Sequence, residues 1–146
     1  MTLDNLLGRS LESITPDPLM IQRLLEAADR NIEDAQLSAL SNENRFDAAY
    51  KGIMQMANAT IQASGYRTLT SKPGHHQTMI QTLPKTIGLD TDTMIILDAM
   101  RKQRNVADYS GDLVPDTAVK ECIKYAKVLR DRVNQWLTLN HPELIK

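Results

Sequence analysis

The chain has 146 residues and a formal net charge of −1, which fits a single domain, residues 1–146, able to bury its core without disulfides or metal. Aromatic residues make up only 4% of it, and its apolar fraction is rich in Leu, Ile, Ala and Met, a composition that favours helices and argues against a β-sandwich. The single Cys122 excludes an internal disulfide, and no His or Cys lies near it at the spacing of a zinc site, so we expect no metal or cofactor. The sequence shows neither a secretory leader nor a long apolar run, so we expect a cytoplasmic protein with no membrane contact.

Two long amphipathic helices are predicted in the first half of the chain. Residues 17–40 begin with an Asp-Pro pair suited to a helix start, and their apolar side chains recur at spacings of three and four. Residues 42–64 repeat this pattern after a cap at Ser41 or Asn42, and Gly65 supplies a left-handed end. Because so few residues join the two helices, we expect them to form an αα-hairpin.

The middle of the chain is less regular. Residues 66–74 mix Thr, Ser, Pro and Gly without periodicity, which predicts an exposed loop. Residues 75–86 are predicted to form one short helix that packs its Met, Ile and Leu side chains inward and that Pro84 ends or kinks.

Two further helices complete the predicted fold. One is capped by an acid or a threonine within residues 90–92 and continues to a stop at Gly111. The last opens at Pro115, carries an apolar stripe that includes Cys122, and ends before Pro142. Together these elements predict an all-α protein, a four- to five-helix up-down bundle with antiparallel neighbours.

Charge is distributed unevenly along the chain. The first fifty residues hold nine acidic and four basic side chains, whereas residues 101–146 hold six acidic and nine basic ones. In one interpretation, the two halves attract each other within the bundle and the helix faces are simply solvated. In the other, the C-terminal third forms a basic patch that faces phosphate.

The densest polar cluster lies near the end of the helix that Gly111 closes. Arg101, Arg104 and Asn105 share one helix face there, beside Lys102, and Tyr109 follows one turn later. Two guanidinium groups and an amide match the oxygens of a phosphodiester, and a phenol stacks on bases or donates a hydrogen bond. The alternative is that these cations complement the helix dipole while Asn105 or Tyr109 satisfies free carbonyl groups.

The remaining candidates for chemistry are few. His75 and His76 follow a Pro-Gly turn, where either is a candidate general acid or base or else a surface residue. Cys122 is interpreted as a buried small side chain, and Tyr50 as the edge of the core with its hydroxyl at the surface. The sequence contains no phosphate-binding loop, dinucleotide fingerprint, HExxH or EF-hand motif.

Three stretches together carry a resemblance to a known family. The segments AAYKGIMQMANATIQASGYR, RKQRNVADYSG and VKECIKYAKVLRDRVNQWL, with GHH between the first two, resemble HEPN domains over about residues 18–138. HEPN domains are small all-α domains of prokaryotic toxin, defence and nucleotidyltransferase-associated systems. The resemblance implies a HEPN-like bundle, a homodimer, and metal-independent RNA cleavage by an Arg and a His four to six residues after it.

The chain departs from the HEPN motif at its histidine. Arg104 and Asn105 match the start of the motif, but no His follows and Tyr109 occupies its place. The resemblance therefore implies that Arg104, Tyr109 and His76 are the catalytic residues. His76, or His75 in its place, would fold back toward Arg104 to replace the missing histidine. Arg101, Arg104 and Asn105 are the implied RNA-phosphate ligands.

Three functions follow from these observations. The first is a HEPN-like RNA- or nucleotide-binding protein, or a metal-independent endoribonuclease with an altered active site, of a toxin–antitoxin or defence system. The second is a non-catalytic helical module that pairs with a nucleotidyltransferase or an antitoxin. The third is a small-ligand-binding bundle that uses its Met-rich interior, although Met at helical spacing is usually core.

Overall fold

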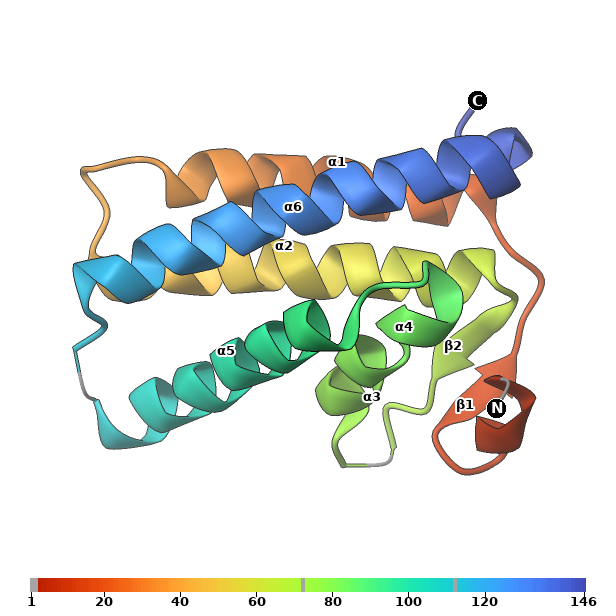
Figure 1. Ribbon diagram of the computed structural model, residues 1–146, viewed down its shortest axis with the longest axis horizontal. Coiled ribbons are helices and arrows are strands. Elements are labelled where there is room, and N and C mark those ends of the chain that lie inside the picture. The colour runs from red at the N-terminus through yellow and green to blue at the C-terminus, as the bar shows by residue number, and fades with distance from the viewer. Residues whose placement is uncertain (1–2, 72, 112) are drawn as a thin grey trace.

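The computed structural model describes residues 3–71, 73–111 and 113–146, and the side chain of Tyr109 also lies outside what it describes. The described chain is mostly helical with one small two-stranded sheet (Figure 1). Its elements are the 3₁₀ helix Leu3–Leu6, β1 Leu11–Ser13, α1 Pro18–Ala35, α2 Asn42–Ala63, β2 Tyr66–Thr68, α3 His75–Gln81, α4 Leu83–Thr86, α5 Thr91–Ser110, α6 Asp116–Asn140 and the 3₁₀ helix Pro142–Leu144.

Helix α2 is the centre of the fold, and α1 and α6 pack along it (Figure 1). Its buried side chains include Phe46, Ile53 and Ile61, so most of its surface is covered by neighbours. Gly52 permits a close approach between α1 and α2, because a Cβ there would lie 3.3 Å from the carbonyl oxygen of Ala28. The long helices α1, α2, α5 and α6 alternate in direction along the chain, and α1 and α2 form the predicted hairpin (Figure 1).

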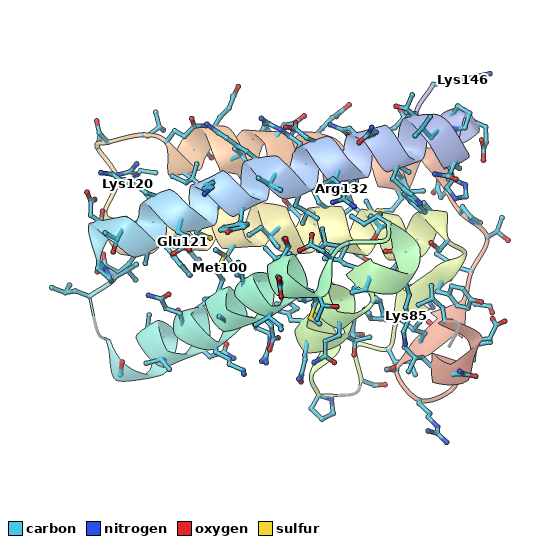
Figure 2. All side chains as sticks on the ribbon, viewed as in Figure 1. Lys85, Met100, Lys120, Glu121, Arg132 and Lys146 are labelled. Carbon is cyan, nitrogen blue, oxygen red and sulfur yellow. The ribbon has the colours of Figure 1, made fainter. Side chains whose placement is uncertain are left out.

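Helix α5 packs against α2 and α3 and lies below α2 in the view of Figure 1. Its side chains Leu97 and Met100 are buried and hold it to the rest of the protein. Figure 2 shows Met100 on the side of α5 that faces α6. Arg132 of α6 fixes the turn before α5, since its Nη2 donates to the carbonyl oxygen of Gly88 at 3.4 Å. Gly111 ends α5 with a φ of 71°, as predicted.

Two predicted helix boundaries are wrong. The first predicted helix, residues 17–40, stops at Ala35, because the last backbone N–H groups bond three residues back and Arg45 Nε of α2 donates to the Ala35 carbonyl at 2.8 Å. The single helix predicted over residues 75–86 is divided at Thr82 into α3 and α4. Pro84 lies in the first turn of α4, where its missing N–H costs no hydrogen bond.

The loop predicted over residues 66–74 is also partly wrong. Its first three residues form β2, which pairs antiparallel with β1 so that Tyr66 faces Ser13 and Thr68 faces Leu11. An ion pair between Arg67 and Glu12 joins the two strands. No helix in the described ranges is long and apolar enough to cross a membrane.

Candidate functional site

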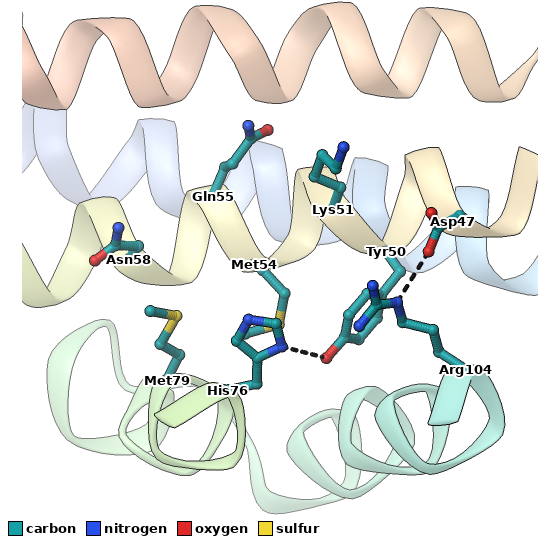
Figure 3. Close-up of a pocket in the computed structure, with 9 residues that line it drawn as sticks. All are labelled: Asp47, Tyr50, Lys51, Met54, Gln55, Asn58, His76, Met79 and Arg104. Atoms are coloured by element: carbon teal, nitrogen blue, oxygen red, sulfur yellow. Dashed lines mark hydrogen bonds and ion pairs between the residues drawn. The ribbon is translucent and has the colours of Figure 1, made fainter. Parts of the chain in front are cut away.

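A pocket of about 270 Å³ opens between α2, α3 and the C-terminal half of α5 (Figure 3). We call it the central pocket. It is lined by Asp47, Tyr50, Lys51, Met54, Gln55 and Asn58 of α2, His76 and Met79 of α3, and Arg104 of α5. The α2 residues fall at spacings of three and four, so one face of that helix forms the wall of the pocket. Apolar Met side chains and several polar groups therefore meet in one concave site, as in many ligand pockets.

Tyr50 lies between Arg104 and His76, the guanidinium and the imidazole of the central pocket. The guanidinium carbon of Arg104 lies 5.3 Å from the centroid of the Tyr50 ring, a cation–π geometry. On the other side, the Tyr50 hydroxyl lies 3.5 Å from Nδ1 of His76 (Figure 3). Burial raises the pKa of Tyr50 to about 12, although Arg104 and Arg101 oppose that rise. The phenol therefore remains protonated at neutral pH and can donate a hydrogen bond.

Arg104 is held in place by two carboxylates. Its Nε donates to Oδ1 of Asp47 at 2.9 Å and lies 3.7 Å from Oδ2 of Asp108. Burial alone would lower the pKa of Arg104, but the hydrogen bond and charge of Asp47 and the charge of Asp108 raise it. Both ion pairs within the described residues use Nε, so the two terminal NH₂ groups remain for a ligand.

His76 is a neutral imidazole at pH 7. Its pKa is lowered from 6.5, first by partial burial and then by repulsion from His75, Arg104 and Arg101. The His75 ring stands edge-on to it with the ring centroids 4.6 Å apart. A neutral imidazole of lowered pKa has the free lone pair that a general base needs.

A second hollow of about 400 Å³, the side pocket, lies beside the central pocket. It is lined by Gly74, His75, His76 and Gln77 around the start of α3 and by Arg101 and Asn105 of α5. His76 lines both pockets and so forms the wall between them. Arg101 is largely buried and its Nε donates to Oδ1 of Asp98 at 2.8 Å, so its charge is already compensated.

The structure divides the predicted cluster of polar residues. Arg104 lines the central pocket with His76, whereas Arg101 and Asn105 line the side pocket. The side chain of Tyr109 lies outside the described residues, and its predicted role stays a prediction. Lys102 is 69% exposed and 3.7 Å from Asp98, away from both linings.

Sequence reasoning missed the polar residues that α2 contributes to the central pocket, which are Asp47, Tyr50, Lys51, Gln55 and Asn58. Asp47 and Lys51 flank Tyr50 in the sequence and lie at the edge of the apolar stripe of α2. The opposite charges beside a Tyr at the edge of the stripe are the signal that could have marked this face as a site. Cys122 is buried as predicted, and burial raises the pKa of its thiol to about 12.

No known protein family, curated protein or solved structure matches this chain. Its function is therefore inferred from the residues of the pocket. Among the described residues, no group of three or more His, Cys, Asp or Glu side chains is placed to hold a metal ion.

The central pocket combines groups suited to reactions at phosphorus. Arg104 supplies a fixed positive charge with free donors, Tyr50 a protonated hydroxyl, and His76 a neutral base. A guanidinium stabilises charge that develops on phosphoryl oxygens, and an imidazole transfers protons in the same step. Lys51 adds a second cation to the wall.

Proposed function

We propose that this chain is a HEPN-like RNA-binding protein that cleaves the RNA backbone in the central pocket without a metal ion. His76 takes the role of the histidine that the HEPN motif has after its Arg. The observation that carries the proposal is that His76 and Arg104, which are 28 positions apart in the sequence, line one pocket on either side of Tyr50.

The proposed reaction is transesterification with the RNA's own 2′-hydroxyl as the nucleophile. The O2′–P bond forms and the P–O5′ bond breaks, which leaves a 2′,3′-cyclic phosphate and a 5′-hydroxyl. In this step Nδ1–H of His76 donates a hydrogen bond to the Tyr50 hydroxyl oxygen, and Nε2 accepts the proton of the 2′-hydroxyl. Solvent water in the open pocket protonates the departing 5′-oxygen.

Arg104 and Tyr50 stabilise the charge that builds up on the phosphorane. The terminal NH₂ groups of Arg104 donate to the non-bridging oxygens, while Asp47 holds Nε and so fixes the plane of the guanidinium. Tyr50 accepts from His76 and donates its own hydroxyl hydrogen toward the phosphate. Met54 and Met79 form the apolar part of the pocket wall beside these donors.

A cleavage assay tests the proposal. Purified protein is incubated with a fluorescent single-stranded RNA in EDTA, and the initial rate is measured for the wild type and for His76→Ala. We expect the substitution to reduce the rate by about 10²–10⁴-fold, the usual contribution of a general base. His141→Ala is the matched control, because His141 lies beside Trp136 and Glu143 at the C-terminal end of α6. Equal rates for wild type and His76→Ala would overturn the proposal.

A second candidate function is a non-catalytic module that pairs with a nucleotidyltransferase, an antitoxin or a second copy of this chain. The observation in its favour is that apolar side chains are exposed on one face of α5: Ile95 and Val106 are 56% and 57% exposed, with Ala99 and Lys102 between them. Leu113, just after α5, is 85% exposed. A chain that cuts no RNA but forms a stable complex that Ile95→Lys disrupts would favour this second function.

A further inference from the structure

The side pocket is a cavity whose lining residues, apart from His76, have no role in the proposed cleavage reaction. It shares only His76 with the central pocket, and its other lining residues carry no carboxylate. Arg101, the guanidinium in the lining, is paired with Asp98. The side pocket is therefore polar but close to electrically neutral, which suits an uncharged group better than a phosphate.

Two of the side chains that line the side pocket are amides. Gln77 and Asn105 face it from α3 and α5, and neither side chain makes a hydrogen bond to another group in the described part of the chain. An amide offers a donor and an acceptor together, which is the pattern displayed by the edge of a nucleobase. His75 adds a flat ring at the same wall, and such rings stack on bases.

A third hollow, on the other side of the central pocket, has a different character. It is lined by Arg30, Asn31, Glu33 and Asp34 of α1, with Lys51 and Gln55 of α2. Its two cations are matched by two carboxylates, and Asn31 is already hydrogen-bonded to Gln55 at 2.8 Å. The side pocket has no carboxylate in its lining and offers two amides, so the base of an RNA bound at His76 extends into it more favourably than into the third hollow.

The position of His76 determines which nucleotide enters the side pocket. In the proposed reaction His76 contacts the 2′-hydroxyl, and the carbon that bears this hydroxyl is bonded to the carbon that bears the base. The base nearest to His76 therefore belongs to the nucleotide on the 5′ side of the broken bond.

We infer that the side pocket binds the base of the nucleotide whose 2′-hydroxyl is the nucleophile, and that Asn105 and Gln77 select among the four bases. This inference rests on the proposed function for its orientation. It makes the protein a base-selective RNA-binding protein whose selectivity resides on one side of the scissile phosphate.

Binding of the four nucleoside 3′-monophosphates tests the inference without any need for cleavage. Each carries a base, a 2′-hydroxyl and a phosphate, and its dissociation constant for the wild type is measured by calorimetry. We expect one or two of the four to bind at least about fivefold more tightly than the others, the lower end of what one bidentate amide–base contact contributes. Asn105→Ala and Gln77→Ala should each reduce that difference, whereas Arg30→Ala, in the third hollow, should leave it unchanged.

The outcomes separate this inference from the proposed function. If binding is selective and depends on Asn105 or Gln77 but the protein cuts no RNA, base binding in the side pocket is supported and the proposed ribonuclease activity is refuted. Equal binding of all four nucleotides, or binding of none, would overturn the inference even if His76-dependent cleavage is observed. Because Asn105 is exposed and Gln77 only half-buried, both variants should fold, and circular dichroism checks that they do.

Discussion

Substitution of Arg104 by Ala should separate catalysis from stability. The Arg104–Asp47 ion pair is partly exposed, at 30% and 47% of the two side chains, so solvent screens most of its energy. Pairs of this kind contribute about 0.2–1 kcal/mol, and the stacking on Tyr50 adds about 0.5–1 kcal/mol. We therefore expect Arg104→Ala to lower the free energy of unfolding by no more than about 2 kcal/mol.

The same substitution should have a much larger effect on RNA cleavage. The loss of one preorganised charge donor typically reduces kcat by about 10²–10³-fold. The assay is the initial rate of cleavage in EDTA, with urea unfolding of the same samples and with Lys102→Ala as the matched control on the exposed side of α5. A loss of several kcal/mol in stability together with unchanged cleavage would show that Arg104 is structural and refute this account.

Three further predictions concern the same pocket and the core beneath it. Tyr50→Phe keeps the ring that Arg104 stacks on but removes the hydroxyl, so cleavage should fall by about tenfold, measured as above, while the melting temperature changes little. Because the pKa of His76 is lowered, the midpoint of the acidic limb of the pH–rate profile should lie below pH 6.5. Arg104→Gln removes a positive charge that disfavours the imidazolium, so it should raise the pKa of His76 in an NMR titration. Gly52→Val should lower the free energy of unfolding by about 1–3 kcal/mol in urea titrations, because its side chain would press on the Ala28 carbonyl, and an unchanged midpoint would contradict the close packing of α1 and α2.

The lowered pKa of His76 also has a consequence for stability. Because the folded state binds this proton less tightly than the unfolded state, protonation favours unfolding. The contribution of His76 to stability is fully present above the unfolded pKa of 6.5, and it falls as the pH drops through 6.5 toward the lower folded pKa. His76→Gln should make the unfolding free energy less dependent on pH in that window.

The long helices were predictable because their signals are local. Asp17 caps α1, Ser41 caps α2 and Gly111 ends α5, each through backbone groups within a few residues. The end of α1 at Ala35 was not predictable in this way, since Arg45 of the next helix accounts for it. The small sheet escaped prediction because each strand has only three residues and its partner lies more than fifty positions away.

The site was predictable as separate residues but not as an arrangement. The density of cations near the end of α5 marked Arg104, and the Pro-Gly turn marked His76. Their shared pocket depends on how α3 and α5 pack against α2, which no local pattern encodes. Tyr50 was expected at the edge of the core with its hydroxyl at the surface, but the residue is buried and its hydroxyl lies against His76 in the pocket.

The chemistry of the RNA ends tests the central claim most directly. A single-stranded RNA is digested in EDTA, the fragments are analysed by mass spectrometry, and a matched RNA carries a 2′-O-methyl group at the main cleavage position. The proposed mechanism predicts 2′,3′-cyclic phosphate and 5′-hydroxyl ends that His76→Ala abolishes, with no cut at the methylated position. Fragments with 3′-hydroxyl and 5′-phosphate ends, or cleavage that persists at the methylated position, would contradict it.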